Sequence, residues 1–245
     1  LIRESPFRSP HQTVSAQALA VGGRNPRPGE ITLAHRGVLF LDERPEFSRR
    51  SLEILRQPLE DKVIRISRVY GTYDFPADFM LCAAMNPCPC GHYPDMNRCQ
   101  CTPAQVMQYL GRISQPLLDR LDLCAEVSPV DFEGLSSGRK GESTQTIRER
   151  VICAQDIQRE RYKREGIQFN GELSGAQIEK YCKMEKDARQ LLKMAFQNMP
   201  VSARAYHRIL KVARTIADME ATESIHRHHI AEALSYRAFD KKYWN

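Results

Sequence analysis

The stretch GVLFLDE, Gly37–Glu43, decides the fold of this chain. Four apolar residues, Val38 to Leu41, run without a break, and two carboxylates, Asp42 and Glu43, follow directly. A short continuous apolar run predicts a strand buried on both faces in a parallel sheet. In an open α/β sheet, ligands bind just outside the carboxyl ends of the strands. We therefore expect the two carboxylates to hold Mg²⁺ and a water directed at a phosphate, the alternative being a strand that ends in a charged turn.

Composition and charge divide the chain into two parts. The 245 residues allow one large domain or two smaller ones, and 42% of them are hydrophobic, an ordinary share for a soluble protein. Residues 1–132 hold 15 Lys/Arg and 15 Asp/Glu, which leaves 21 of the 36 basic and 15 of the 30 acidic residues for 133–245. The excess positive charge in the second part favours an anionic partner or, equally, a solvated basic helical surface.

No apolar run is long enough to cross a bilayer, and the first residues do not resemble a signal peptide. We therefore expect a cytoplasmic protein with no membrane partner. The cysteines scattered outside residues 88–101 fit this compartment, because such thiols are usually reduced and buried there.

The segments after the central strand alternate between helix and strand patterns, which is the order of an α/β fold. A helix is predicted over 48–60, an exposed hairpin over 62–75 and a second buried strand over 79–85. A further strand is predicted over 123–127. Residues 133–145 contain Gly, Ser and charged residues with almost nothing apolar, which is typical of a linker.

Beyond that linker, the patterns are helical throughout. Ser202 is expected to cap a long amphipathic helix and Ser224 to cap the last one. We therefore expect residues 1–132 to form an α/β part with loop-rich insertions, 133–145 to form a linker, and 146–245 to form an all-α domain.

Several longer segments resemble the AAA+ ATPases of the magnesium chelatase-related group, and most closely the ComM/YifB family. In chain order they are SPFRSPHQT, GGRNPRPGEITLAHRGVLFLDE, AAMNPCPCG, ISQPLLDRLDL and SARAYHRILKVARTIADME. Such a series is far more specific than any one segment, and it covers almost the whole chain. The resemblance implies an incomplete AAA+ P-loop NTPase core, with a parallel sheet and helices, followed by an all-α lid.

The resemblance also implies a function. It points to a cytoplasmic hexameric ATPase that couples ATP hydrolysis to DNA remodelling or translocation, as in branch migration or competence. Asp42 and Glu43 match the Walker B pair, so that Asp42 would hold Mg²⁺ and Glu43 would polarise the attacking water. Asn86 matches the sensor 1 residue, although a turn-forming Asn before Pro is the alternative.

Two arginines match residues that stabilise phosphate charge in this group. Arg120 resembles the arginine finger, which acts on the nucleotide of the next subunit and therefore implies a ring. Arg112 is a weaker candidate for the same surface. Arg204 matches sensor 2, which reaches from the lid to the γ-phosphate of ATP.

The phosphate-binding pattern GxxxxGK[ST] does not occur in the 245 residues. The family places this loop ahead of the segments found here. We therefore expect the chain to be the C-terminal part of a longer ATPase. We also expect that it does not hydrolyse ATP by itself, because the loop amides and lysine hold the nucleotide.

Four of the eight cysteines fall in one short window, as the pairs Cys88/Cys90 and Cys99/Cys101. Four thiolates in a polar loop are suited to Zn²⁺, with His92 as a substitute ligand. Each pair is separated by one residue rather than by the two of a usual zinc knuckle. Unligated surface thiols and, after them, disulfides are the alternatives.

The hairpin ahead of Asn86 carries basic and aromatic residues, Arg65, Arg68, Tyr70 and Tyr73. Basic groups suit phosphates and aromatic rings suit unstacked bases, so the pattern favours contact with DNA. In machines related to the family this hairpin points into the pore of the ring. An ordinary exposed hairpin is the alternative.

Two other functions fit the same residues. One is a chelatase-type ATPase that remodels a protein partner for metal insertion, since fold does not fix function. The other is a non-catalytic module that binds DNA or zinc only. The basic balance of the chain favours DNA over the first of these.

Overall fold

The computed structural model describes residues 4–22, 26–43, 47–68, 71–127, 141–198 and 202–237. The described residues form two compact units that meet in the chain at Leu121 and Asp122. The predicted linker 133–145 lies outside the described residues as far as residue 140, and the next helix already begins at Thr144.

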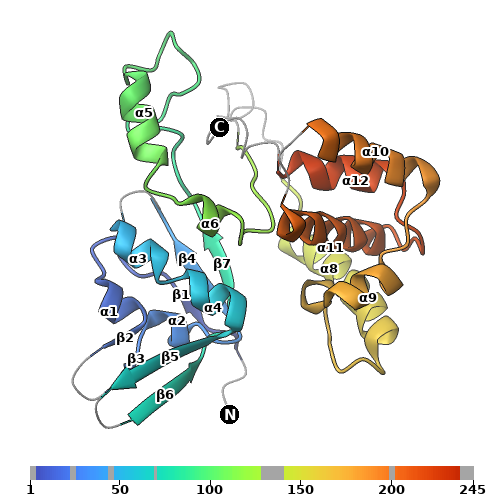
Figure 1. The fold of residues 1–245 in the computed structure, drawn as a ribbon, viewed down its shortest axis with the longest axis horizontal. Coiled ribbons are helices and arrows are strands. Elements are labelled where there is room, and N and C mark those ends of the chain that lie inside the picture. Colours follow the sequence, from blue (N-terminus) through green and yellow to red (C-terminus); the bar gives the residue numbers. More distant parts are fainter. Residues whose placement is uncertain are drawn as a thin grey trace. The chain divides into compact units, whose positions relative to one another are not determined.

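The first unit is built on a three-stranded parallel sheet (Figure 1). Strand β4 (Val38–Leu41) lies between β1 (Phe7–Arg8) and β7 (Met80–Ala83). Residue Leu41 pairs with Ala83, so β4 and β7 end at the same edge of the sheet. Gly37 is required where β1 approaches β4, because a Cβ there would lie 1.9 Å from the carbonyl oxygen of Pro6.

One face of this sheet is buried and the other is not. Leu39 and Leu41 are fully buried, whereas Val38 and Phe40 are half-buried, with the Phe7 ring stacked on Phe40 at 6.1 Å between centroids. Strand β7 is mostly exposed, and Met80 is 66% exposed. The prediction of two strands buried on both faces was therefore wrong, because the helices that the structure describes in the first unit pack on one face.

The short helices of the first unit supply that packing. They are α1 (Ala16–Leu19), α2 (Glu30–Leu33), α3 (Arg49–Glu53), α4 (Arg56–Asp61) and α6 (Gln115–Leu118). Leu19, Leu52 and Leu117 belong to one apolar cluster with Leu39 and Leu41. The helix predicted over 48–60 is two helices, α3 and α4, and Ser48 caps the first of them.

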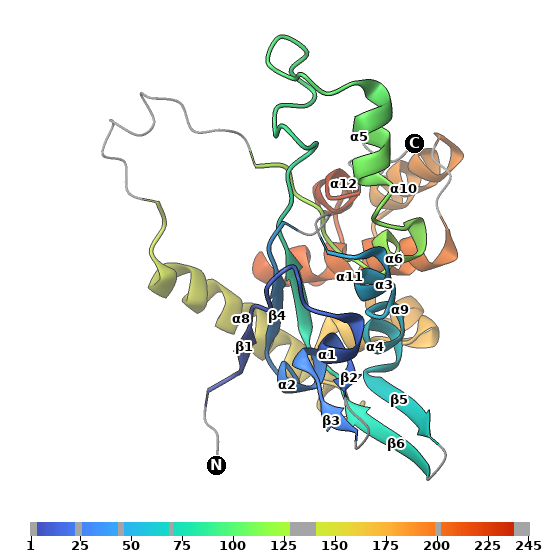
Figure 2. The ribbon, with the colours of Figure 1, turned by 90° about the vertical axis from the view of Figure 1, so that its left-hand side faces the viewer.

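Two further elements extend from this core. The hairpin of β5 (Val63–Arg68) and β6 (Gly71–Pro76) confirms the predicted hairpin. The hairpin lies at the opposite end of the unit from helix α5 (Pro103–Leu110) (Figures 1 and 2). A small antiparallel pair of strands, β2 (Val21–Gly22) and β3 (Arg27–Pro28), lies near the hairpin.

The strand predicted over 123–127 was wrong. The structure describes residues 123–127 without regular secondary structure. Leu123 is 54% exposed and Val127 is 89% exposed. Apolar side chains that find no neighbouring strand do not form a ladder, whatever their spacing in the sequence.

The second unit is helical, as predicted. Its elements are α8 (Thr144–Tyr162), the 3-10 turn η2 (Asn170–Glu172), α9 (Gly175–Tyr181), α10 (Lys186–Asn198), α11 (Ala203–Met219) and α12 (Arg227–Ser235). Ser202 caps α11 as expected, with its hydroxyl accepting from the Ala205 amide at 3.2 Å. Helix α12 begins after His226, so the cap predicted at Ser224 was wrong.

A buried ionic network holds the second unit together. Asp218 of α11 accepts hydrogen bonds from both terminal nitrogens of Arg161, from Arg214 at 3.1 Å and from Asn170 at 2.8 Å. The side chain of Arg214 is 1% exposed and also donates to backbone carbonyls of Thr222 and Glu223. Burial lowers the pKa of Arg214, and the carboxylate of Asp218 opposes that effect.

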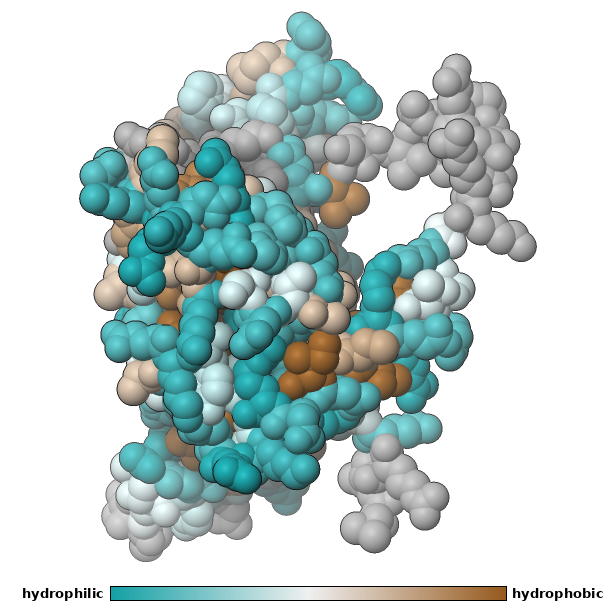
Figure 3. Space-filling view, turned by 90° about the vertical axis from the view of Figure 1, so that its right-hand side faces the viewer, coloured by the Kyte–Doolittle hydropathy of each residue, from teal (hydrophilic) through white to brown (hydrophobic). Residues whose placement is uncertain are grey.

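The surface of the molecule contrasts with these cores. Figure 3 shows a face that is mostly hydrophilic, with a few apolar side chains among the charged ones. None of the helices in the described ranges combines the length and the apolar character that a bilayer crossing requires.

Candidate functional site

Asp42 and Glu43 lie directly after β4, in a turn at the carboxyl edge of the sheet. Both are exposed, and the Asp42 carboxylate accepts a hydrogen bond from the Glu43 amide at 3.0 Å. Glu43 has a φ of 49°, in the left-handed region that side chains other than glycine rarely adopt. Arg36, Lys62 and Ala221 adopt the same region, so this conformation describes the turn after β4 and does not by itself mark a site.

Asn86 follows β7 and reaches the same edge. Because β4 and β7 are parallel and in register from Val38–Met80 to Leu41–Ala83, both chains leave the sheet side by side. Asn86 is exposed. Asp42, Glu43 and Asn86, which the sequence predicts to act on a nucleotide, therefore follow the same end of two neighbouring strands.

Arg120 lies just after α6 and is engaged within its own unit. It forms an ion pair with Glu60 of α4 and donates to the Pro116 carbonyl at 2.7 Å. Its side chain is only 10% exposed. The pair borders a pocket of about 450 Å³ that is lined further by residues of α3 and α4. Sequence reasoning missed Glu60, because nothing local connects two residues sixty positions apart.

Arg204 and Arg112 are both exposed. Arg204 lies in the first turn of α11, so it belongs to the second unit, whereas Asp42 and Asn86 belong to the first. The Arg112 guanidinium carbon lies 6.0 Å from the centre of the Tyr109 ring, within reach of a cation–π contact.

The β5–β6 hairpin presents Arg65 and Tyr73, but Arg65 has an acidic partner. Arg65 faces Asp74 across the strands and donates to it twice, at 2.9 and 3.0 Å. The Arg65 hydrogen bonds lower the pKa of Asp74. Tyr73 is 39% exposed. Tyr70 and the side chain of Arg68 lie outside the described residues.

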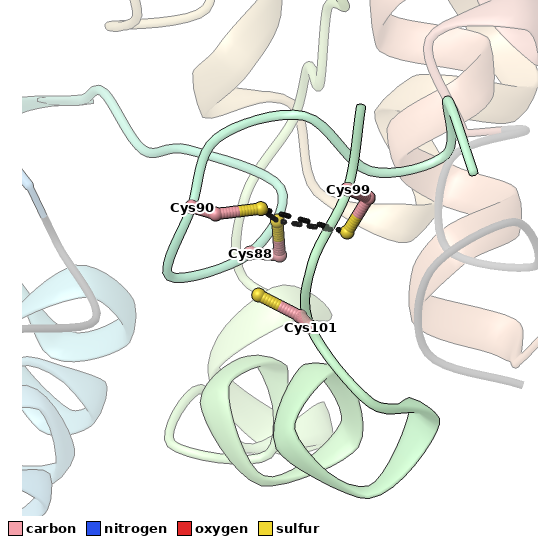
Figure 4. A group of neighbouring side chains, drawn as sticks. All are labelled: Cys88, Cys90, Cys99 and Cys101. Atoms are coloured by element: carbon pink, nitrogen blue, oxygen red, sulfur yellow. Dashed lines mark hydrogen bonds between the residues drawn. The ribbon is translucent and has the colours of Figure 1, made fainter. Parts of the chain in front are cut away.

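The four clustered cysteines converge in the loop between β7 and α5 (Figure 4). The Cys88 sulfur lies 3.4 Å from that of Cys90 and 3.8 Å from that of Cys99, and Cys90 and Cys99 are 3.5 Å apart. All four sulfurs, including that of Cys101, lie within 4.8 Å of one another. His92, the expected substitute ligand, is exposed and does not belong to this group.

The thiols perturb one another. A hydrogen bond from the His92 backbone, against the opposing effect of burial, lowers the pKa of Cys90 to about 6. The Cys101 backbone favours the thiolate of Cys99, but burial and the neighbouring thiols outweigh it and raise the pKa of Cys99 to about 12. Once one of these thiols has lost its proton, deprotonation of the next is disfavoured, because it would place a second negative charge close to the first.

A second group of metal-ligand type, Glu220, His228 and His229, was not anticipated from the sequence. The Nδ1 atom of His229 accepts from the His226 amide at 3.0 Å, which places the proton on Nε2. That Nε2 atom then donates to Glu220 at 3.0 Å and is not available as a ligand. The group therefore serves as the cap of α12 and ties it to the end of α11.

Comparison with known proteins finds two matching family models. Residues 1–135 match the family model described as magnesium chelatase, subunit ChlI, and residues 141–237 match that of the ChlI C-terminal part. YifB of Salmonella typhimurium is 47% identical over 241 residues, which is 98% of this chain and 46% of the relative. Competence protein ComM of Haemophilus influenzae is 47% identical over 237 residues, 96% of this chain and 46% of the relative.

YifB of Escherichia coli is 46% identical over 241 residues, again 98% of this chain and 46% of the relative. The chain thus spans about half the length of the curated relatives it matches. The first family model covers the α/β unit and the second covers the described helices of the second unit. The chain belongs to the magnesium chelatase ChlI family, in the group that contains YifB and ComM.

Proposed function

We propose that this chain supplies the Walker B, sensor and arginine-finger part of an AAA+ ATPase that acts on DNA in the cytoplasm. The single observation that supports it most is the shared edge of β4 and β7, which brings Asp42, Glu43 and Asn86 to one end of the sheet. That edge is where open α/β sheets bind ligands.

The exposed residues at this edge suit ATP and Mg²⁺. Carboxylate oxygens are the ligands that Mg²⁺ takes, so Asp42 would hold the ion, which neutralises phosphate charge when bound. Glu43 would accept a proton from, or orient, the attacking water. Asn86 would hold the water or the γ-phosphate by its amide, without adding a charge.

Arg120 and Arg204 would complete the site by charge. In this proposal the chain works in a hexameric ring, where Arg120 stabilises the transition state on a neighbouring subunit and Arg204 reaches the γ-phosphate. Because Arg120 is paired with Glu60 within its own unit, ring assembly must exchange that partner for phosphate.

The ATPase proposal is tested in a chimera, because the chain spans about half of each relative. This chain replaces the matching segment of ComM from Haemophilus influenzae, and ATP hydrolysis is measured by phosphate release. Glu43→Gln lowers kcat by about 10²- to 10⁴-fold, since a positioned base contributes that much. Glu160→Gln, on an exposed glutamate of α8, is the matched control and leaves kcat unchanged. Full activity of the Glu43→Gln chimera contradicts the proposal.

DNA is the substrate we propose, and the hairpin is the contact. Arg65 and the exposed ring of Tyr73 lie on the element that projects from the first unit, and the name of the Haemophilus relative, competence protein, fits a role on DNA. Remodelling of a protein partner, as in a chelatase, is the competing outcome, which the family name favours.

The DNA contact is tested on this chain by fluorescence anisotropy of labelled single strands across a salt series. Arg65→Ala weakens binding and reduces the salt slope by about one, while Asp74→Asn strengthens binding because it removes a competing carboxylate. The exposed pair Arg159–Asp156 of α8 gives the matched control variants, Arg159→Ala and Asp156→Asn. Equal effects at both pairs would mean that only net charge matters, and the hairpin would not be the contact.

A further inference from the structure

We propose that Cys88, Cys90, Cys99 and Cys101 bind one structural Zn²⁺ ion, which fastens the exit of strand β7 to the start of helix α5. The ligands come from two separate turns of the same loop, and their sulfurs point toward one another (Figure 4). This centre goes beyond the proposed ATPase, and its test does not depend on ATP hydrolysis.

The spacing of the sulfurs fits a tetrahedral ion. A Zn–S bond of about 2.3 Å places the sulfurs of a tetrahedral site about 3.8 Å apart. The observed separations of 3.4, 3.5 and 3.8 Å lie at or slightly inside that value. All four sulfurs lie within 4.8 Å of one another, which leaves room for one ion and not for the body of an iron–sulfur cluster.

The ligand set is closed. Four cysteines fill a tetrahedral coordination sphere, so no position is left for water or substrate, which is the mark of a structural site rather than a catalytic one. Cys88 is fully buried and the other three are half-buried, so the centre is screened from solvent. The Tyr93 amide donates to the Cys88 sulfur at 3.4 Å, as amides do around metal-bound thiolates.

The loop needs such an ion. Residues 84–102 contain no helix or strand, and the apolar cluster beneath them is small. Its buried members are Cys88 and three residues of α5, Val106, Tyr109 and Leu110, and Met85, Tyr93 and the other three clustered cysteines are only partly buried against it. An ordered conformation with so little burial requires another source of free energy, and metal binding supplies it in small domains.

The alternatives fit less well. None of the eight cysteines, all of which are described, is in a disulfide. Each of Cys88, Cys90 and Cys99 lies at nearly the same distance from the other two, rather than in separate pairs. Four thiols without a shared ligand would also not be expected to converge from two separate turns of the loop.

The position of the centre gives it a role. Cys88 comes two residues after Asn86, and Cys101 directly precedes Thr102, whose hydroxyl caps α5 in a capping box. An ion between them would fix where the chain leaves β7 and where α5 starts. On the proposed function, it would thereby hold the backbone next to Asn86.

The test is metal analysis of this chain. The protein is produced with zinc in the medium, and loosely bound metal is removed by gel filtration. Elemental analysis by mass spectrometry is then expected to find about one zinc ion per chain. Cys88→Ser and Cys101→Ser each lower the zinc affinity by more than about tenfold, because a ligand is lost from a four-ligand site. Cys153→Ser, on the exposed face of α8, is the matched control and keeps the ion.

A second measurement guards against variants that fail to fold. In the wild-type chain, zinc is removed with a chelator and replaced with Co²⁺, which is expected to give the visible and charge-transfer bands of a tetrahedral four-thiolate site. Zinc-free wild-type protein, iron in place of zinc, or a disulfide among these cysteines after preparation under reducing conditions would each overturn the proposal.

Discussion

The described residues of the two units contain two polar clusters, one around Asp218 and one around Cys88, that differ in how their charge is balanced. Around Asp218 in the second unit, the protein itself supplies the partners, two guanidinium groups and an amide. Around Cys88 in the first unit, four groups that ionise to the same sign meet. Buried polar groups need partners. The Asp218 cluster contains charges of both signs, whereas the cysteine cluster requires a cation that the protein does not supply.

The largest expected effect is on the loop of residues 84–102. Removal of the metal should abolish its order, because coordination is the main source of its stability. Hydrogen exchange of the amides in this loop should then rise by more than about a hundredfold, whereas α11 in the second unit keeps its protection. The two regions are compared in one sample by mass spectrometry. Unchanged protection of the loop would remove the contrast between the two clusters.

Next comes Asp218→Ala, which leaves Arg214 buried without its carboxylate. Breaking a buried pair on one side costs about 3–5 kcal/mol of unfolding free energy. Urea denaturation followed by circular dichroism measures the change. Asp156→Ala is the control: it removes an α8 carboxylate that is 62% exposed and also paired with an arginine. It should change the unfolding free energy by less than about 0.5 kcal/mol. A similar loss in both variants would show that the Asp218 network is not a unit.

Glu60→Gln tests how firmly Arg120 is held. Loss of this charged partner should lower the unfolding free energy of the first unit by about 1 kcal/mol, as for a partly exposed charged hydrogen bond. Phenylglyoxal should also modify Arg120 faster, because the guanidinium is no longer engaged by Glu60. Asp74→Asn, in the exposed Arg65 pair of the same unit, is the control for stability. Unchanged labelling of Arg120 would show that Glu60 does not restrain it.

The smallest effect concerns pH and the second unit. Glu165 accepts hydrogen bonds from Lys180 at 2.6 Å, from Tyr181 and from Gln177, and these lower its pKa from 4.5 to about 2. A lowered folded-state pKa stabilises the fold above pH 4.5, and that contribution is lost as the pH falls toward 2. Glu165→Gln should therefore lower the Tm slightly at pH 7, and the difference from the wild type should shrink below pH 4.5.

Glu179→Gln, on an exposed glutamate of α9, the helix that carries the partners of Glu165, controls for the loss of one charge. It should leave the Tm nearly unchanged at every pH. A difference for Glu165→Gln that is constant from pH 7 to 3 would mean that ionisation of Glu165 is not its cause.

Much of this protein follows from the sequence alone, because the relevant signals are local. The run Val38–Leu41 sets the central strand, the alternation after Lys62 sets the hairpin, and Ser202 sets the start of α11. The two cysteine pairs lie in one loop, so their meeting needs only two turns of the chain. The order of the family segments was likewise readable without coordinates, and the family assignment is confirmed.

Only the tertiary structure decided the rest, because contacts between distant segments depend on the path of the whole chain. The partner of Arg120 lies sixty residues earlier, and the partners of Asp218 include one 57 residues away. Burial of a strand on one face or two depends on which helices cover the sheet, which an apolar run does not encode. Helix α12 likewise begins after His226, whose amide donates to a ring nitrogen of His229 at 3.0 Å, and the local pattern at Ser224 did not indicate that start.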